Sequence, residues 1–250
     1  MKIPTTNADR AKYAAARAAL DLVTPGMRLG IGTGSTAAWF VELLGQRVAG
    51  GLDIVGVPTS SVTAAQAKGL GIPLTTLDAA GWLDLTVDGA DEFDADLNLI
   101  KGAGGALLQE MIVASASDRM VVISDESKEV AQLGAFALPV EVVRFGWETT
   151  QALVAKLLAA MGYANTRIAP RMKDAGLYIT DEGHYLLDLN LGKITDERAL
   201  SIALNRIPGV VETGLFIDIA QSVLVGYADG RVRVIDAAGE GTAQQVEMPE

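Results

Sequence analysis

Short apolar runs alternate with longer segments of helical spacing along the first half of the chain. Strand-like apolar runs occupy residues 27–31, 53–57, 83–87 and 120–123. Apolar positions recur at helical spacing in residues 7–22, 37–44 and 62–69, and Pro25-Gly26 ends the first of these segments. Alternating strands and helices with short loops are typical of a parallel sheet covered by helices. The pattern therefore predicts an α/β fold.

The rhythm changes after residue 142. A helix is predicted near residues 149–161, strands near residues 166–172, 178–180 and 185–189, and another helix near residues 196–206. The last strands, at residues 210–216, 222–227 and 232–235, are expected to rejoin or flank the main sheet. We therefore predict a main domain of residues 1–133 and 207–250 and a smaller α+β domain of residues 134–206 inserted in it.

Polar loops follow four of the predicted strands. They are Thr33-Gly34-Ser35-Thr36, Ser60-Ser61, the turn from Asp88 to Asp91, and Ser127-Lys128. Because ligands of open parallel sheets bind beyond the carboxyl ends of the strands, we expect these loops to converge on one edge.

The loop Gly32-Thr33-Gly34-Ser35-Thr36 has two interpretations. It is either a tight turn between strand and helix or a cradle that offers backbone N–H groups, hydroxyls and a helix N-terminus to an anion. It lacks the lysine of a P-loop, and Ala37 stands where a dinucleotide-binding loop has its third glycine.

Carboxylates and a lysine cluster around a glycine-rich segment. Asp88 and Asp91 are three residues apart after a predicted strand, which alone would fit a solvated turn, and Lys101-Gly102-Ala103-Gly104-Gly105 follows closely. A nearby ammonium keeps carboxylates ionised, so the group favours a functional site. Glu110 lies at helical spacing among apolar neighbours, where a buried carboxylate is suited to general-base catalysis and an exposed helix residue is the alternative.

Lys128 and His184 carry weaker signals. Lys128 follows a polar loop where a phosphate could bind, although most lysines are simply solvated. His184 lies between Gly183 and Tyr185 in an expected hairpin, and we interpret it as a surface residue.

Composition narrows the chemistry. The 250 residues contain no cysteine and one histidine, which excludes disulfides, thiolate nucleophiles and His-rich metal centres. A formal net charge of -11 argues against general nucleic-acid binding, and no segment approaches the roughly 20 apolar residues of a membrane span. We expect a cytoplasmic protein without membrane or nucleic-acid partners.

Several motifs together resemble ribose-5-phosphate isomerase of type A, over residues 13–236. The matching segments are residues 30–37, Asp88-Gly89-Ala90-Asp91-Glu92, residues 101–110, Ser127-Lys128, Leu138-Pro139-Val140-Glu141-Val142 and residues 207–216. The resemblance implies a Rossmann-like parallel sheet domain with an inserted ferredoxin-like α+β domain. It also implies interconversion of D-ribose 5-phosphate and D-ribulose 5-phosphate through an enediolate, in the non-oxidative pentose phosphate pathway, without metal or cofactor.

The same resemblance implies the site residues. Glu110 matches the base that moves the proton, Asp88 the carboxylate associated with ring opening, and Asp91 and Lys101 the groups that hold and polarise oxygens. The expected substrate-binding residues are Thr33, Gly34, Ser35, Thr36, Asp88, Gly89, Ala90, Asp91, Lys101, Gly102, Ala103, Gly104 and Lys128. Members of the family are usually homodimers or homotetramers.

One departure and two alternatives remain. The family often has basic residues beside its catalytic glutamate, whereas this chain has Gln109 and Met111, so we expect weaker electrostatic attraction of the substrate. A CoA-transferase, with Glu110 as a nucleophile on a thioester, is a second enzyme hypothesis. A sugar-phosphate sensor is a third, although no basic DNA-binding segment is visible.

Overall fold

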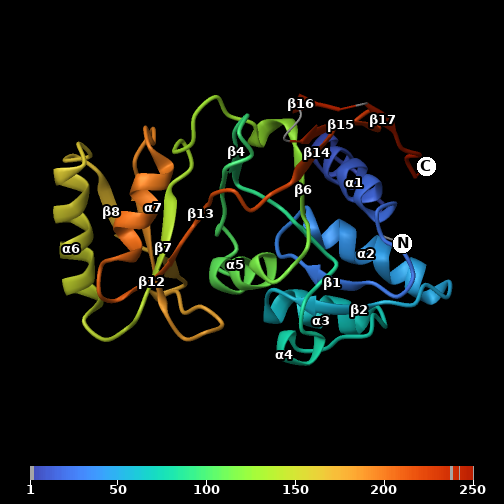
Figure 1. The fold of residues 1–250 in the computed structure, drawn as a ribbon, viewed down its shortest axis with the longest axis horizontal. Coiled ribbons are helices and arrows are strands. Elements are labelled where there is room, and N and C mark those ends of the chain that lie inside the picture. Colours follow the sequence, from blue (N-terminus) through green and yellow to red (C-terminus); the bar gives the residue numbers. More distant parts are fainter. Residues whose placement is uncertain (1–2, 237–238, 242, 250) are drawn as a thin grey trace. The chain divides into compact units, whose positions relative to one another are not determined.

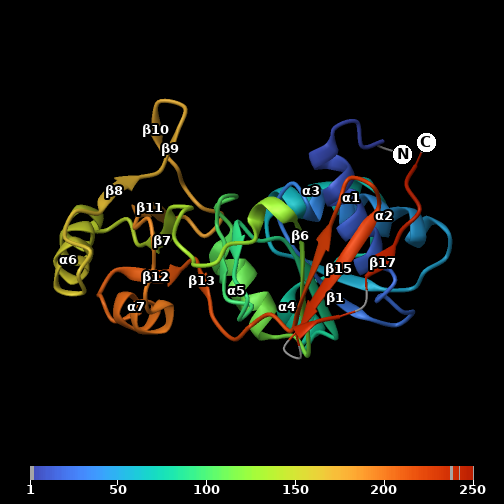
Figure 2. The same cartoon turned by 90° about the horizontal axis from the view of Figure 1, so that it is seen from above.

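The computed structural model describes residues 3–236, 239–241 and 243–249. The chain divides into two compact units (Figures 1 and 2). The first unit consists of Met1–Ala90, Gln109–Glu129 and Asp218–Glu250, and the second of Asp91–Leu108 and Val130–Ile217. The domain division predicted at residues 134 and 206 stays a prediction.

The first unit is built on a mostly parallel sheet. Its strands are β1 (Arg28–Ile31), β2 (Val55–Pro58), β3 (Leu85–Asp88), β6 (Met120–Asp125), β14 (Ser222–Gly226), β15 (Arg231–Asp236), β16 (Gly239–Glu240) and β17 (Gln244–Gln245). The order is β16-β15-β14-β6-β3-β1-β2, with β17 also paired to β15. The strands from β14 to β2 are parallel, and β15 joins β14 in antiparallel register. The predicted α/β fold is confirmed.

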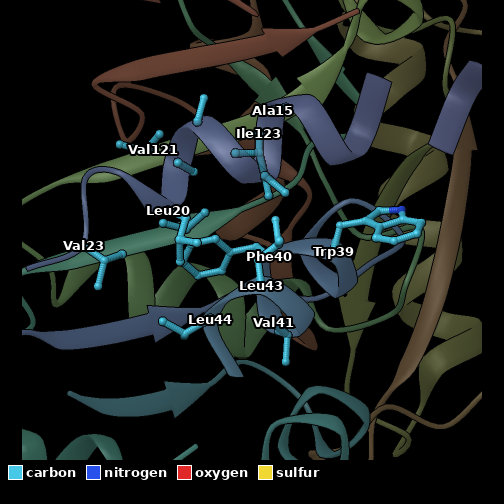
Figure 3. Packing of buried hydrophobic residues seen from close by; sticks show 14 of the residues in the cluster. Ala15, Leu20, Val23, Trp39, Phe40, Val41, Leu43, Leu44, Val121 and Ile123 are labelled. Atoms are coloured by element: carbon cyan, nitrogen blue, oxygen red, sulfur yellow. The ribbon is translucent and has the colours of Figure 1, made fainter. Parts of the chain in front are cut away.

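Helices cover both faces of this sheet. They are α1 (Asn7–Leu20), α2 (Ala37–Ala49), α3 (Ser61–Gly69), α4 (Leu77–Ala80) and α5 (Leu107–Ser115), and a 3₁₀ turn, η1 (Glu126–Lys128), follows β6. Residues of α1 and α2 share the main core with β1 and β6, and Ala15, Phe40 and Ile123 are fully buried there (Figure 3). The small alanines of α1 let it approach the sheet closely; a Cβ on Gly226 would lie 2.1 Å from the carbonyl oxygen of Ala11.

The second unit contains a four-stranded antiparallel sheet and two helices. The strands of this sheet, in the order β12-β7-β11-β8, are β7 (Leu138–Val142), β8 (Arg167–Pro170), β11 (Tyr185–Asn190) and β12 (Val210–Thr213), and the helices are α6 (Trp147–Ala160) and α7 (Glu197–Asn205). The unit also has a three-stranded sheet of β4 (Glu92–Phe93), β5 (Leu99–Ile100) and β13 (Leu215–Phe216) and a hairpin of β9 (Met172–Lys173) and β10 (Gly176–Leu177). The sheet strands and the two helices follow one another along the chain as β7-α6-β8-β11-α7-β12, interrupted only by the β9–β10 hairpin. This β-α-β-β-α-β order confirms the expected ferredoxin-like fold.

One core holds this second sheet to its helices. Val154 and Leu158 of α6 and Leu200 and Leu204 of α7 are buried together with residues of β7 and β11. The two helices lie side by side in both views, and Figure 2 shows the β9–β10 hairpin projecting from the sheet.

Two predicted strands are wrong in detail. Residues 210–216 do not form one strand that rejoins the main sheet: β12 pairs with β7, and β13 pairs with β5 in a small three-stranded sheet. The break falls at Gly214, whose N–H donates to Pro139 and whose carbonyl accepts from Lys101, leaving no room for a side chain. Residues 178–180 form no strand, because Ile179 is half exposed and the chain has already turned out of the β9–β10 hairpin.

Among the residues that the structure describes, no helix combines the length and the apolar character needed to cross a membrane.

Candidate functional site

The first glycine loop is joined to the end of β3 by close packing and backbone hydrogen bonds. The N–H of Thr33 donates to Oδ1 of Asp88 over 3.0 Å, and the N–H of Gly89 donates to the same oxygen over 2.7 Å. A Cβ on Gly32 would lie 2.1 Å from that oxygen, so only glycine allows this approach. Asp88 is fully buried at the carboxyl end of its strand, and the loop holds its carboxylate in one orientation.

A cluster of hydroxyls ties the first loop to the second. Oγ1 of Thr33 lies 2.8 Å from Oγ1 of Thr59, 2.8 Å from Oγ of Ser60 and 3.0 Å from Oγ1 of Thr63. Oγ1 of Thr63 in turn donates to the carbonyl of Gly32. Of the four loops expected to converge, those at Thr33, Ser60 and Asp88 are therefore joined by hydrogen bonds, and the Thr33 hydroxyl joins two of them. The convergence of Ser127-Lys128 with these loops stays a prediction.

The exposed part of the first loop has positive groups beside it. Gly34 and Ser35 are exposed, and Nζ of Lys12 donates to Oγ of Ser35 over 3.0 Å. The helix α2 begins here with no acidic residue in its first turn and no side-chain cap from Thr36, so none of these side chains neutralises its N-terminal partial charge. An ammonium, backbone N–H groups and a helix N-terminus make a suitable anion site.

Lys12 was missed by sequence reasoning. It lies in the alanine-rich helix α1, 23 residues before Ser35, and no motif surrounds it. Only the packing of α1 beside α2 brings its ammonium to the loop.

Glu110 lies in the first turn of α5, as the helical spacing predicted, and is only 4% exposed. One helical turn later, Val113 is buried with Val57 and Leu83, and a Cβ on Gly30 would lie 2.6 Å from its methyl group. Residues three apart share a helix face, so Glu110 lies on the side of α5 that packs on the sheet. Its burial makes this carboxylate a candidate base.

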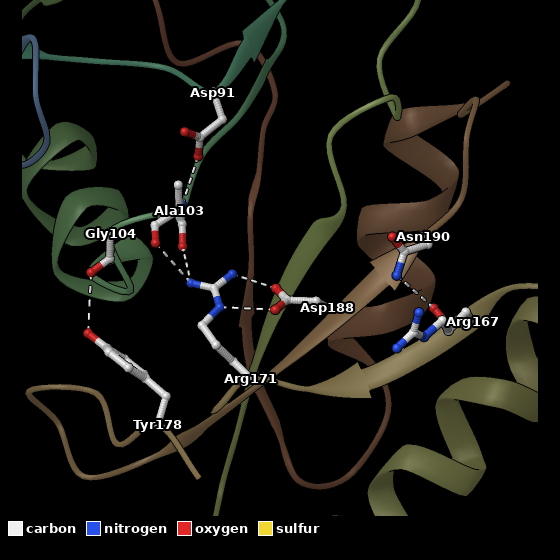
Figure 4. Close-up of polar contacts among 9 residues, drawn as sticks. Asp91, Ala103, Gly104, Arg167, Arg171, Tyr178, Asp188 and Asn190 are labelled. Carbon is white, nitrogen blue, oxygen red and sulfur yellow. Dashed lines mark hydrogen bonds and ion pairs between the residues drawn. The ribbon is translucent and has the colours of Figure 1, made fainter. Parts of the chain in front are cut away.

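The second unit contains the other predicted polar groups. Lys101 follows β5 and is 2% exposed, with Nζ lying 5.5 Å from the ring centroid of Phe216. Oδ2 of Asp91 accepts a 2.8 Å hydrogen bond from the N–H of Ala103 (Figure 4). Gly102 is buried, whereas Ala103 and Gly104 are exposed. The segment after β5 therefore combines a lysine, a carboxylate and exposed backbone.

Lys128 and His184 have different surroundings. Lys128 is half-buried in η1, directly after β6, and Oδ1 of Asp125 accepts the N–H of Ser127 to open that turn. His184 is not simply a surface residue as expected, because its Nδ1 lies 2.9 Å from Oε1 of the buried Glu141. Oε1 of Glu141 also accepts from Thr180, and burial raises the pKa of this carboxyl.

The structure thus forms two polar groups, one in each unit. In the first, Thr33, Gly89 and Asp88 are bonded together and Lys12 adjoins Ser35. In the second, Asp91 and Ala103 are bonded within the segment that begins at Lys101. Among the residues that the structure describes, no three His, Cys, Asp or Glu side chains are placed to hold a metal ion.

Comparison with known proteins identifies related sequences. A family model described as Ribose 5-phosphate isomerase A (phosphoriboisomerase A) matches residues 55–230. Ribose-5-phosphate isomerase A of Ruegeria sp. (strain TM1040) is 59% identical over 237 residues, which cover 94% of this chain and 90% of the relative. The protein of the same name from Cereibacter sphaeroides is 57% identical over 242 residues, covering 96% and 92%.

Solved structures show the same similarity. The structure of ribose 5-phosphate isomerase A from Methanocaldococcus jannaschii matches with a TM-score of 0.80 and 38% identity, over 96% of this chain and all of that one. A D-ribose-5-phosphate isomerase in complex with phospho-erythronic acid matches with a TM-score of 0.82 and 36% identity, again over 96% and 100%.

Proposed function

Because the chain belongs to the ribose 5-phosphate isomerase A family, we propose that it interconverts D-ribose 5-phosphate and D-ribulose 5-phosphate in the pentose phosphate pathway. The observation that carries this proposal is 59% identity to a relative of that name over 94% of the chain. A structure in this family was solved with phospho-erythronic acid, a small phosphorylated acid, which supports a sugar phosphate as the ligand.

The chemistry requires a base and a means of stabilising negative charge. A proton next to a carbonyl is removed and returned at the neighbouring carbon, while the oxygens carry the charge of an enediolate. We assign the proton transfer to Glu110, whose burial at the start of α5 suits a base. The buried ammonium of Lys101 stabilises the developing charge, and Asp91 holds a hydroxyl of the substrate.

Asp88 and the first glycine loop have separate roles in this proposal. Asp88, fixed by two backbone N–H groups, assists opening of the sugar ring. The phosphate binds at Gly34, Ser35 and Thr36, where Lys12 and the N-terminus of α2 supply positive charge, and Lys128 contributes a second ammonium. Gly89, Ala90, Gly102, Ala103 and Gly104 offer backbone groups to the sugar.

Assembly and location follow from the family resemblance. We propose a homodimer or homotetramer that acts in the cytoplasm, where its sugar phosphate substrates are metabolised. Size-exclusion chromatography with light scattering distinguishes the two assemblies by mass.

The substitution Glu110→Gln tests the assignment of the base. The amide is nearly isosteric but cannot accept the proton, so turnover of ribose 5-phosphate should fall at least ~10²-fold while calorimetry still detects substrate binding. Glu148→Gln is the matched control, because Glu148 is also a first-turn helix glutamate but is exposed, and it should retain full activity. Full activity of Glu110→Gln would show that another group is the base.

A further inference from the structure

We propose that Arg171 is a positioning residue for the isomerase reaction: its guanidinium fixes the peptide groups of the glycine loop, residues 102–105, and through them the carboxylate of Asp91. The inference rests on the proposed function, since it concerns the segment that carries Lys101 and Asp91. It adds a residue from a distant part of the second unit, because Arg171 lies 68 residues after Ala103.

The guanidinium of Arg171 joins a carboxylate to two carbonyls (Figure 4). Nε donates to Oδ2 of Asp188 over 3.0 Å, and Nη2 donates to Oδ1 of the same carboxylate. Nη1 donates to the carbonyl of Gly102 over 2.6 Å and to that of Ala103 over 3.2 Å. Asp188 thus holds the plane of the guanidinium, which then binds the loop.

A planar peptide connects this contact to Asp91. The carbonyl of Gly102 and the N–H of Ala103 belong to one peptide group, and in a trans peptide they point in opposite directions. When Arg171 holds the carbonyl on one side, the N–H must face the other side, where it donates to Oδ2 of Asp91 over 2.8 Å. Loss of the guanidinium leaves that carbonyl with the neutral N–H of Gly105 as a donor, so the peptide is held less firmly, and so is the N–H that orients Asp91.

The loop's own residues restrain this peptide through the N–H of Gly105, which donates to the carbonyl of Gly102 over 3.0 Å, but its glycines leave the backbone easy to turn. Gly102 and Gly105 have φ angles of +112° and +75°, a region that glycine enters without penalty and leaves as readily. Ala103 and Gly104 are exposed, so water could satisfy their carbonyls. At the exposed carbonyl of Ala103, the hydrogen bond from Arg171 therefore fixes the orientation of the loop rather than replacing water at a buried group.

Arginine is specifically suited to this place. Its rigid fork makes a two-point contact with Asp188 and leaves Nη1 for the loop, whereas a lysine ammonium has no such plane. Tyr178 supports the same loop from another side, because its hydroxyl lies 3.3 Å from the carbonyl of Gly104 and its ring lies against Gly105.

The ion pair between Arg171 and Asp188 is also accessible to solvent. A cavity of about 460 Å³ in the second unit is lined by Arg171, Asp188, Ala103, Arg167 and other residues. Removal of the Arg171 side chain would leave the Asp188 carboxylate beside this cavity, where a small guanidinium ion can enter.

The test measures kcat and KM for ribose 5-phosphate in the wild type, Arg171→Ala, Arg171→Lys and Asp188→Asn. Misplacement of reacting groups by a fraction of an ångström lowers turnover, so we expect kcat to fall about 10- to 100-fold in Arg171→Ala. Arg171→Lys should recover little of that loss, and Asp188→Asn should show a smaller one. Arg167→Met, which removes an exposed arginine at the same cavity, is the control and should match the wild type.

Two readouts separate positioning from a general loss of structure. Millimolar guanidinium, which is far too dilute to unfold the protein, should restore part of the kcat of Arg171→Ala, whereas a variant that is merely destabilised would gain no activity from it. In an Asp91→Asn background, Arg171→Ala should lower kcat less than twofold further, because its effect passes through Asp91. Multiplicative effects would contradict that route.

The outcomes distinguish this inference from the proposed function. A wild type that does not isomerise ribose 5-phosphate refutes the proposed function itself. An active wild type whose Arg171→Ala and Arg171→Lys variants keep kcat within twofold refutes the role of Arg171 alone. Equal losses in all variants without rescue by guanidinium would also overturn it.

Discussion

The substitution Gly32→Ala tests whether close approach of β1 to Asp88 shapes the first polar group. A methyl group at this position would lie 2.1 Å from Oδ1, 2.2 Å from Cγ and 2.6 Å from Cα of Asp88. Ordinary contact begins near 3.4 Å, so the backbone of Asp88 would have to withdraw by about 0.8 Å. That backbone belongs to β3, which is paired on both sides and buried along its whole length.

The expected cost follows from this displacement. Overpacking a filled interior destabilises by about 1–3 kcal/mol, which for a chain of this size lowers Tm by between about 2 and 12 °C. The shift also breaks the geometry of the Thr33 and Gly89 N–H groups on Asp88, so we expect kcat to fall about 10- to 100-fold.

The assay combines urea unfolding with turnover of ribose 5-phosphate. Gly69→Ala is the control, because a Cβ there meets no atom within 4 Å and its backbone has no positive φ. This control should be as stable as the wild type or slightly more so, with normal activity. A Gly32→Ala variant within 0.5 kcal/mol and twofold of the wild type would refute the packing argument.

Two further substitutions test the electrostatics of the second unit. Lys101→Met removes the buried ammonium and should lower kcat by about 10²- to 10³-fold, whereas Lys156→Met, at an exposed lysine of α6, should leave it unchanged. For Glu141, burial raises the pKa of the folded state above 4.5, so the folded state binds more protons than the unfolded state and stability falls as pH rises from that value. Urea unfolding of Glu141→Gln between pH ~4.5 and ~7 should show a smaller fall than the wild type, and equal falls would contradict this sign.

Local pattern was enough to predict most of the fold. Strands β1, β2, β3 and β6 begin and end within two residues of the predicted runs, because each is a short apolar segment bounded by turn residues. The hydrophobic pattern gave a wrong prediction at Gly214, because the apolar residues on both sides of it indicated a single strand. The division into β12 and β13 depends on Lys101 and Pro139, which approach this glycine from other parts of the second unit.

The residues of the candidate site likewise fall into those that the sequence indicated and those that it did not. Asp88, Asp91, Lys101 and Glu110 lie in recognisable motifs, so the sequence indicated them, although their roles stay predictions. Lys12 and Arg171 lie in no motif, and each reaches its glycine loop only through the packing of elements distant in sequence. Contacts of that kind cannot be read from spacing along the chain.

Proton NMR of ribose 5-phosphate in D₂O, with the purified protein and EDTA, tests the central claim most directly. We predict formation of ribulose 5-phosphate together with entry of solvent deuterium at the reacting carbons, because a carboxylate base exchanges its proton with water during the enediolate step. Absence of both conversion and deuterium entry would contradict the isomerase proposal and the role of Glu110.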